Sequence, residues 1–343
     1  MAVETRTIKA DEAGLRLDRW FKTHYPALAF GHLQKLLRTG QVRVDGARAK
    51  TNTRLAPGQK VRVPPLEKAG KPAQAEAGSV AAPHVLKEKS ARAKPDDATF
   101  LKSITLYEDR DVMVLNKPMG LAVQGGSGTV RHIDGMLEAL RTRDGVKPRL
   151  VHRIDKDTSG ILLIAKTRLA AATLAKSFRS RAARKIYWAL VAGVPKVRQG
   201  RISTYLAKGG GPEGELMRVA KHGEEGADHA VTYYAVVENA ANLLSWLSLK
   251  PVTGRTHQLR AHAAHIGHPI VGDPKYFDIE NWELPGGIQN RLHLLARRLV
   301  LPHPGGKGKI DVTAPLPPHM QQSWNLLGFD AKQYDPIVDA PEA

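Results

Sequence analysis

The 343-residue sequence contains no cysteine. This absence excludes disulfide bonds, a thiol nucleophile, zinc ribbons and iron–sulfur clusters. Long hydrophobic runs are also missing, since no window approaches the ~18 apolar residues that a membrane span requires. The N-terminus, MAVET, lacks the basic-then-apolar order of a secretion signal. Together these absences predict a soluble cytoplasmic protein with no membrane partner.

Acidic residues are scarce relative to basic ones: 33 Asp and Glu stand against 52 Lys and Arg, a formal net charge of +19. Hydrophobic residues make up 42% of the chain, which indicates a folded protein rather than a disordered polycation. A large positive charge on a folded protein favours a polyanionic partner, and nucleic acid is the commonest. A basic surface without such a partner is the alternative.

Composition divides the chain into four segments. Residues 1–65 are strongly basic and predict a compact module. Residues 66–98 contain no aromatic residue and no isoleucine, so they bury too little apolar surface to hold one conformation and predict a flexible linker. Apolar periodicity returns over residues 99–329, where most motifs lie. Residues 330–343 predict a loosely ordered tail.

The first module has the apolar spacing of two short helices followed by a hairpin. Apolar residues stand at i, i+3 and i+4 in residues 17–21 and again in 33–37, and Gly40 is a natural helix stop. The turn signal Asp45-Gly46 follows. The polar sides of these elements carry Arg16, Arg19, Lys35, Arg38, Arg43 and Arg48. This basic surface could simply be solvated, or it could bind phosphate groups.

Three runs in this module, RLDRWF, HLQKLLRTGQVRVDG and LAPGQKVRVP, resemble the S4 RNA-binding domain over nearly all of residues 14–64. The order of the parts and the spacing K-x-x-R-x-G-x-V-x-V-D-G carry the resemblance. It implies that the module does no chemistry itself and binds structured RNA through basic residues, namely Arg16, Arg19, Lys35, Arg38 and Arg43.

Several common catalytic motifs are incomplete. Residues 125–129, GGSGT, lack the final glycine of a nucleophile elbow, and Gly306-Lys307 is not followed by the Ser or Thr of a phosphate loop. Four histidines crowd together, but their spacing matches no metal-ligand signature and no cysteine joins them: His257, His262, His265 and His268. We therefore predict no metal site, expect these histidines to pack or to hydrogen-bond RNA phosphates, and disfavour a hydrolase of another class.

The segment LVHRIDKDTSG at residues 150–160 precedes an apolar run at 161–165 that predicts a buried strand. Asp155 and Asp157 therefore lie on a loop that leads into a core strand, where a rigid element can position a side chain. From the residues alone, the two could be a catalytic carboxylate pair, a loop cap or salt-bridge partners of Arg153. Spacing does not decide among these roles.

The longer segment HRIDKDTSGILLIAK resembles the H-R-(L/I)-D-x-x-T-S-G-(L/I)-L-L signature of the RluA family of pseudouridine synthases. Four further segments agree in the family's order: NKPMGLAV from residue 116, KIYWALV from 185, TGRTHQLRAH from 253 running on to GHPIVGD, and LHLLARRL from 292. With the first module, the resemblance covers most of residues 14–305. The chain departs from many relatives at Gln124, where they have His, and the stretch from Gln124 most resembles members that act on 23S ribosomal RNA.

The resemblance implies the isomerisation of uridine to pseudouridine in RNA, a reaction that needs no cofactor and no metal. It implies that Asp155 acts as a nucleophile or as a base, that Arg260 forms a salt bridge with it, and that Tyr187 stacks on the target base. Arg153 would fill the space left by an extruded uridine. Phosphate contacts would come from Lys117, Lys156, Lys176, Arg179, Arg184 and Arg255.

The implied partner is ribosomal RNA, either 23S RNA or a pre-50S particle, bound by a monomer. The alternative is a non-catalytic S4-type RNA-binding or ribosome-assembly factor. Such a factor would be expected to lack Asp155, which is present here.

A helix is predicted at residues 169–181, and strands outnumber helices without regular βαβ alternation, at 105–115, 185–191, 230–238 and 245–250. This pattern predicts an α+β fold with a mixed, largely antiparallel sheet. The family resemblance implies the same fold, a bent sheet with a catalytic cleft, preceded by the small S4-like helix-helix-strand module. Strand alternation also places Tyr187 opposite Ile186 and Trp188, towards the cleft.

Overall fold

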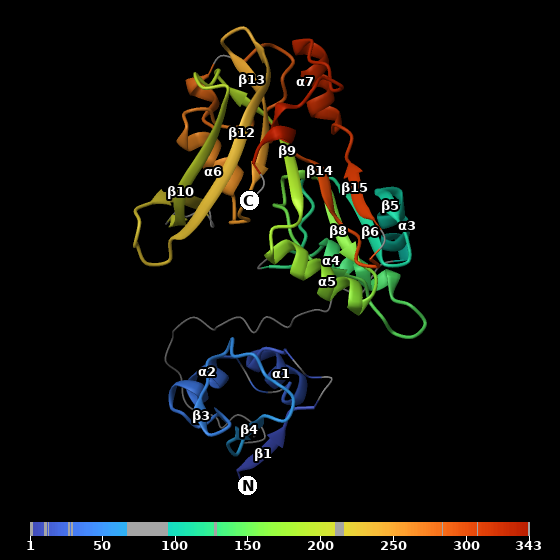
Figure 1. The fold of residues 1–343 in the computed structure, drawn as a ribbon, viewed down its shortest axis with the longest axis vertical. Coiled ribbons are helices and arrows are strands. Elements are labelled where there is room, and N and C mark those ends of the chain that lie inside the picture. Colours follow the sequence, from blue (N-terminus) through green and yellow to red (C-terminus); the bar gives the residue numbers. More distant parts are fainter. Residues whose placement is uncertain are drawn as a thin grey trace, which may run out of the picture. The chain divides into compact units, whose positions relative to one another are not determined.

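The computed structural model describes residues 3–9, 12, 14–26, 28, 30–66, 95–126, 129–209, 216–282, 284–306 and 308–341. The chain forms two compact units, residues 1–85 and residues 86–343, which Figure 1 colours from blue to red along the sequence. Each unit has a hydrophobic core of its own. No helix in the described part of the chain is long and apolar enough to cross a membrane.

The N-terminal unit contains two helices and a small antiparallel sheet of order β1-β4-β2-β3. Its elements are β1 (Glu4–Thr7), α1 (Leu17–His24), α2 (Phe30–Arg38), β2 (Arg43–Val44), β3 (Ala47–Arg48) and β4 (Lys60–Val63). The predicted helices and hairpin are present, and Asp45 and Gly46 form the turn with φ of 48° and 76°. Strand β1 was not predicted, because its sequence ETRT has no apolar face.

The core of the N-terminal unit is built by the residues whose spacing predicted the helices. Trp20 and Phe21 from α1 are 1% exposed, and three leucines of α2 pack into the same cluster. Valines from β2 and β4 close it from the sheet side. The unit is therefore a small, separately packed body whose helices turn their basic sides outward.

The C-terminal unit, residues 86–343, holds the residues predicted to be catalytic, and this catalytic unit has an α+β fold, as predicted. Its elements are α3 (Pro95–Ser103), β5 (Thr105–Glu108), β6 (Val112–Lys117), α4 (Ile133–Met136), η2 (Leu137–Leu140), β7 (Arg149–Leu150), β8 (Ser159–Ala165), α5 (Arg168–Arg179), β9 (Arg184–Ala192), β10 (Gln199–Gly209), β11 (Leu216–Ala220), β12 (Asp228–Ala240), β13 (Leu244–Pro251), α6 (Gln258–His265), η3 (Ile279–Asn281), β14 (Leu294–Pro302), β15 (Lys309–Thr313), α7 (Pro318–Leu327) and η4 (Pro336–Asp339).

One eleven-stranded sheet runs through this unit in the order β11-β10-β12-β13-β9-β14-β8-β6-β5, with β15 beside β14 and β7 beside β8. Among the described strands, β14 and β8 pair in parallel and the other ladders are antiparallel. Figure 1 shows the β10–β12 half and the β8–β6 half splaying apart on either side of β9 and β13. Strands β8 and β13 are buried at every residue, as expected for central strands.

Gly160 allows the parallel pair at the centre of the sheet to form. A Cβ atom at this position would lie 2.3 Å from the carbonyl oxygen of Ala296 on β14, and the φ of Gly160 is +102°. Only glycine accepts both conditions. The close approach fixes the start of β8, and therefore the end of the loop that carries Asp155.

One predicted boundary needs correction. Helix α3 begins at Pro95, before the predicted domain start at residue 99, because a proline at the first helical position and acidic residues in the first turn favour a helix there. Leu101 anchors this helix in the core at 0% exposed. Residues 67–94, most of the predicted linker, lie outside the described residues.

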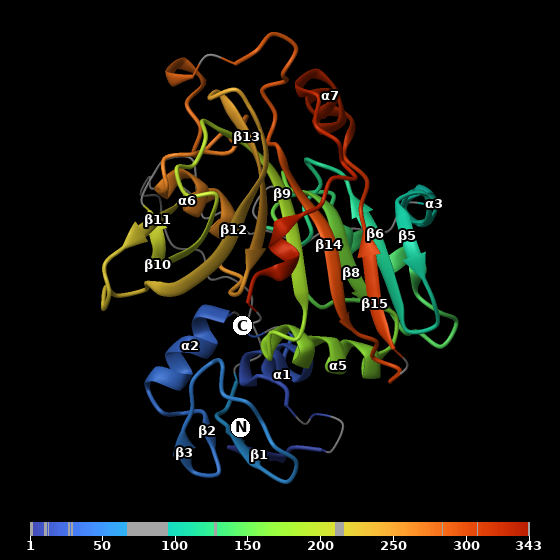
Figure 2. The same ribbon diagram turned by 45° about the horizontal axis from the view of Figure 1, so that its top comes forward.

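The prediction of a loosely ordered tail at residues 330–343 is wrong for residues 330–341. The 3-10 helix η4 packs on β12 and β13 (Figure 2), and Ile337 is 1% exposed within the main core. The carboxylate of Asp335 accepts hydrogen bonds from Trp188 Nε1 at 2.9 Å and Ser248 Oγ at 2.7 Å. Ile337 and Val338 are a single adjacent pair of aliphatic residues in a segment that is mostly polar, so no periodic signal predicts these contacts from the sequence.

Candidate active site

A cavity of about 650 Å³ opens in the catalytic unit, so the predicted cleft is present. Its walls come from the loop before β8, the C-terminal part of α5, strand β9 and the turn from β13 into α6. Asp155, Tyr187 and Arg260 all line it, and so do Arg153 and Arg255. The structure therefore brings together residues from three separate sequence segments.

Asp155 is the sole carboxylate among the residues that line this cavity in the described part of the chain. Its side chain is 20% exposed, and one oxygen lies 3.9 Å from Nη1 of Arg260. The loop is held by buried Ile154 on one side and by a turn hydrogen bond from Thr158 N to Asp155 O of 3.2 Å on the other. Asp155 thus faces solvent-accessible space from a fixed backbone.

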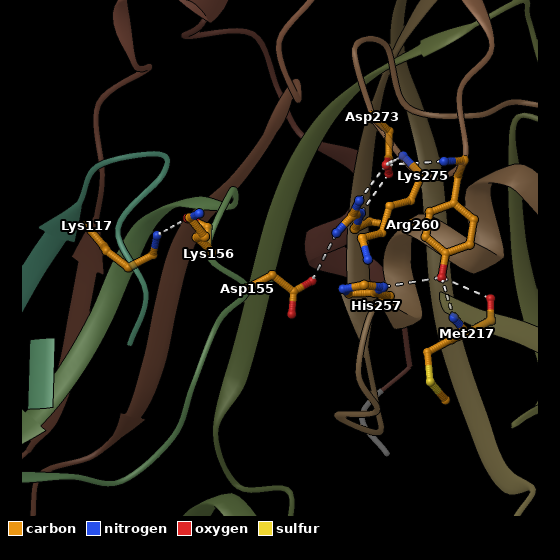
Figure 3. A network of polar contacts seen from close by, with 9 residues as sticks. Lys117, Asp155, Lys156, Met217, His257, Arg260, Asp273 and Lys275 are labelled. Atoms are coloured by element: carbon orange, nitrogen blue, oxygen red, sulfur yellow. Dashed lines mark hydrogen bonds and ion pairs between the residues drawn. The ribbon is translucent and has the colours of Figure 1, made fainter. Parts of the chain in front are cut away.

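Arg260 is held in place by Asp273, a residue that the sequence analysis did not single out. Nε and Nη2 of Arg260 donate to the two Asp273 oxygens at 2.7 and 2.5 Å, and the two side chains are 2% and 0% exposed. Asp155 and Asp273 approach the guanidinium from different sides in Figure 3. Burial opposes the charge of Arg260, but hydrogen bonds and the negative charges of both carboxylates raise its pKa. Asp155 therefore faces a permanent cation.

The residue before Asp273 is Gly272, and a larger residue would not fit there. Gly272 has a φ of +68°, and a Cβ there would lie 2.1 Å from the carbonyl oxygen of Arg291. Asp273 also accepts a hydrogen bond from the backbone N of Lys275 at 2.9 Å. The only sequence signal for this residue was its place at the end of GHPIVGD, within a family segment already recognised.

His257 and Tyr276 join the active site to strand β11. Tyr276 OH accepts a hydrogen bond from Met217 N at 2.8 Å, donates to Met217 O at 2.9 Å and lies 3.3 Å from His257 Nδ1 (Figure 3). Burial lowers the pKa of His257, whereas the negative charge of Asp155 acts in the opposite direction. His257 has a left-handed φ of +49° and lines the cavity, so its ring forms part of the site.

Tyr187 lies in the cavity wall, whereas its strand neighbours Ile186 and Trp188 are in the core, as alternation predicted. Burial, and then the charge of Asp155, raise the pKa of Tyr187. Its phenol keeps its proton at neutral pH. Tyr187 can therefore stack and donate a hydrogen bond, but it is not a base under these conditions.

His152 forms part of the wall and was not predicted as a site residue. Its Nε2 accepts a hydrogen bond from Leu163 N at 2.8 Å, and its ring stacks on Phe178 with centroids 4.7 Å apart. Burial, and then the positive charge of Lys185, lower its pKa to about 3. His152 is therefore a neutral ring that fixes α5 against the catalytic loop.

The expected phosphate contact by Lys117 is wrong. Its side chain is 0% exposed, and its Nζ donates to the carbonyls of Pro118, Leu121 and Lys156 at 2.8–2.9 Å. Burial lowers its pKa to about 7, although the charges of Asp157 and Asp155 favour the ammonium form. Figure 3 shows Lys117 reaching the loop beside Asp155. This lysine holds two loops together, because β6 ends inside the core and directs it inward.

The other basic residues of the catalytic unit differ in their surroundings. Arg153 and Lys156 are exposed, and Arg255 pairs with Asp228 at 3.1 Å while remaining on the cavity rim. Arg184 does not point to a free surface, because its guanidinium donates to the carbonyl of Val338 in the C-terminal segment. Lys176 and Arg179 belong to the last turn of α5, and Arg179 lines the cavity.

In the N-terminal unit, Arg19, Lys35 and Arg38 are exposed on the two helices. Arg16 pairs with Asp18 at 2.6 Å. Arg43 is half-buried and donates to the carbonyls of Gly40 and Gly46 at 3.1 and 2.9 Å, so it holds the hairpin turn.

The histidine cluster does not form a metal site in the described part of the chain, where no group of three or more potential ligands meets. His262 is buried and hydrogen-bonds Thr204 and Thr232 at 2.9 Å each. His268 contacts the carbonyl of Ala192 at 2.9 Å. Packing, one of the two roles predicted for these histidines, is what His262 and His268 do.

Comparison with known proteins agrees with this geometry. The family model described as RNA pseudouridylate synthase matches residues 111–265. Ribosomal large subunit pseudouridine synthase C of Escherichia coli K12 is 36% identical over 326 residues, covering 92% of this chain and 95% of that protein. The protein of the same name from Vibrio cholerae is 35% identical over 323 residues, covering 92% and 94%.

A solved structure, human RNA pseudouridylate synthase domain containing 4, is 26% identical with a TM-score of 0.56, covering 69% of this chain and 97% of that one. It extends the agreement from sequence to fold. The identity, the coverage of both chains and the shared fold lead to one conclusion: the chain belongs to the RluA family of RNA pseudouridylate synthases, which isomerise uridine to pseudouridine in RNA.

Proposed function

We propose that this chain modifies uridines of the large-subunit (23S) ribosomal RNA, with Asp155 as the carboxylate that acts on an extruded uridine. The observation that carries the proposal is the single carboxylate of the cavity, 3.9 Å from a buried arginine. The names of the relatives from Escherichia coli and Vibrio cholerae support the large ribosomal subunit as the source of the substrate. The protein would act as a cytoplasmic monomer on free RNA or on a pre-50S particle.

The isomerisation breaks the bond between uracil N1 and ribose C1′, rotates the base and joins C5 to C1′. The proton on C5 leaves and N1 gains one, so no second substrate is consumed. Asp155 would begin the reaction as a nucleophile or as a base, and either role requires its ionised form. Arg260, which Asp273 holds in place, would form an ion pair with Asp155 and so orient its carboxylate.

The protonated phenol of Tyr187 would stack on the uracil and donate a hydrogen bond to it. A uridine reaches such a cavity only after leaving its stack, at a cost of a few kcal/mol. Arg153, exposed at the cavity mouth, would occupy the vacated space. Lys156 and Arg255 would contact phosphates near it.

The N-terminal unit would be an S4-type RNA-binding module. The exposed cations of its two helices, Arg19, Lys35 and Arg38, would bind phosphates, with Arg16 beside them. Replacing Arg19, Lys35 and Arg38 by Gln should lower the salt dependence of RNA binding by about 0.9 in log–log slope per lost contact. An unchanged slope would show that this unit is not the RNA anchor.

The test of the proposed reaction uses unmodified 23S and 16S transcripts with wild-type protein and Asp155→Asn. Pseudouridine is mapped by carbodiimide adducts that stop primer extension. Stops in 23S RNA with wild type alone are expected, and Asp157→Asn, a change in the same loop outside the cavity lining, should keep them. RNA that is bound but never modified, including pre-50S particles, would favour the non-catalytic binding alternative.

A further inference from the structure

A second, smaller hollow of about 170 Å³ adjoins the active-site cavity. Arg181, Lys185, Pro251 and Val252 line both spaces, so the two are neighbours across a shared wall. Four of its nine lining residues are cations and none is acidic in the described part of the chain, namely Arg181, Arg184, Lys185 and Lys250. Such a lining favours an anionic ligand.

Lys185 is the cation placed between the hollow and the cavity. It stands two residues before Tyr187 on β9, so both side chains leave the same face of the strand, about 7 Å apart. Within the described residues, the side chain of Lys185 forms no hydrogen bond and no ion pair, whereas its backbone belongs to the β9–β14 ladder. Burial lowers its pKa, which an incoming anion would counteract.

Arg181 lines the same two spaces as Lys185 and has an unfavourable backbone conformation. Its φ is +62°, in the left-handed region that L residues rarely adopt, directly after the C-terminal end of α5. Its side chain is exposed, lines both spaces and has no hydrogen-bond or ion-pair partner among the described residues. Glycine would meet the backbone requirement without strain, so replacing Arg181 by Gly removes the cation without straining the backbone.

The remaining two cations of the lining, Arg184 and Lys250, contact the C-terminal segment. Lys250 Nζ donates to the carbonyls of Ala340 and Pro341 at 3.0 and 2.9 Å, and Arg184 donates to the carbonyl of Val338. The Nε atom of Arg184 is buried and has no hydrogen-bond partner. The C-terminal segment thus fixes these two side chains and leaves Arg181 and Lys185 as the available donors.

We propose that Arg181 and Lys185 bind a phosphodiester group of the RNA strand next to the extruded uridine. The strand would enter the hollow while the uracil enters the cavity beside Tyr187, so that the backbone is fixed where the base turns out. Arginine and lysine are the usual donors to phosphate, and hydrogen bonds to a charged group are the strong ones. This inference rests on the proposed function, since it takes RNA as the ligand.

The test is a thermodynamic cycle between side chain and phosphate. RNA fragments that contain a target uridine are made with one neutral methylphosphonate linkage at a time around it. Dissociation constants are measured in the Asp155→Asn background, where no product forms. Lys185→Met and Arg181→Gly should each weaken binding of the normal RNA about 10-fold. A neutral linkage at one flanking position should weaken RNA binding by the parent protein about as much. The same linkage should weaken RNA binding by the Lys185→Met protein hardly at all, because the contact is already lost.

Two control variants match these changes. Ala241→Gly relieves another left-handed residue, with φ of +46°, but removes no charge. Lys102→Met removes an exposed lysine of α3, away from both spaces. Both should bind RNA as the parent does. Arg181→Gly should also keep the parent's melting temperature, because glycine suits this backbone.

Equal losses from a neutral linkage in parent and variants, at every position, would overturn the proposal and indicate diffuse attraction only. If Lys185→Met has a lower melting temperature than the parent, the same binding measurements are made with Lys185→Gln and Arg181→Gly. The proposed reaction is judged separately, by pseudouridine formation with Asp155 intact. Product with no coupling refutes the phosphate site alone, whereas coupling without product refutes the reaction alone.

Discussion

Replacing Asp273 by Ala should destabilise the catalytic unit strongly, because it leaves the buried charge of Arg260 without its partner. Arg260 and Asp273 are 2% and 0% exposed and share two hydrogen bonds of 2.7 and 2.5 Å. Breaking a buried pair from one side typically costs about 3–5 kcal/mol. Asp155 is already beside Arg260 in the wild type, at 3.9 Å, and brings no new compensation.

Asp155→Ala is the matched control, since it removes a carboxylate from the same arginine. Its side chain is 20% exposed and its contact is the longer one, so we expect a loss below about 1 kcal/mol. A second comparison replaces both partners with apolar residues, Arg260→Met with Asp273→Leu. This pair should recover most of the stability lost in Asp273→Ala, because no unpaired charge remains.

The assay is urea unfolding of the intact chain, followed by tryptophan fluorescence, since four of the five tryptophans lie in the catalytic unit. Pseudouridine formation is measured in parallel. Asp273→Ala should lose about 10²-fold in rate through misplacement of Arg260, and the double apolar variant should stay inactive despite its recovered stability. The reasoning is refuted if Asp273→Ala unfolds within about 1 kcal/mol of wild type, or if the double variant is less stable than the single one.

Three further changes probe other parts of the catalytic unit. Lys117→Met removes a buried ammonium that donates to three carbonyls, so the free energy of unfolding should fall by about 3 kcal/mol in urea unfolding. Catalysis should also be slower, because the loop beside Asp155 is loosened. Burial lowers the pKa of His262 and His293 to about 4. Between about pH 4 and about pH 6.5, the unfolded chain therefore binds more protons than the folded chain, and the free energy of unfolding falls as the pH is lowered. The expected loss is about 1.4 kcal/mol per pH unit for each histidine, measured by urea unfolding from pH 7.5 to 5. Ile337→Ala should cost about 2–4 kcal/mol by the same assay, because this side chain is 1% exposed.

Each of these has a result that contradicts it. Wild-type stability in Lys117→Met would show that solvent replaces the ammonium donor. A pH slope that His262→Gln leaves unchanged would mean that this histidine is not buried in a neutral form. A loss below about 0.5 kcal/mol at Ile337 would mean that the C-terminal segment detaches in solution.

Much of the fold follows from local side-chain spacing. The apolar spacing at residues 17–21, the helix expected at 169–181 and the buried strand expected at 161–165 correspond to α1 (17–24), α5 (168–179) and β8 (159–165). A helical period of 3.6 and a continuous apolar run both appear directly in the order of the residues. The cavity also holds Asp155, Tyr187 and Arg260, the three residues that the family motifs singled out. Their chemical roles remain predictions.

Tertiary structure decided what each polar side chain does. Lys117 and Lys156 are both lysines in recognised motifs, yet one is buried against three carbonyls and the other is exposed. Asp273 became the partner of Arg260, and the C-terminal segment packed on Trp188, through contacts between chain positions that no periodic pattern links. Side-chain spacing in the sequence was enough to predict the amphipathic helices and the buried strands, because this pattern is local, whereas β1 and η4 carry no such pattern. Which charges are buried, and against what, depends on long-range packing, and only the folded chain shows it.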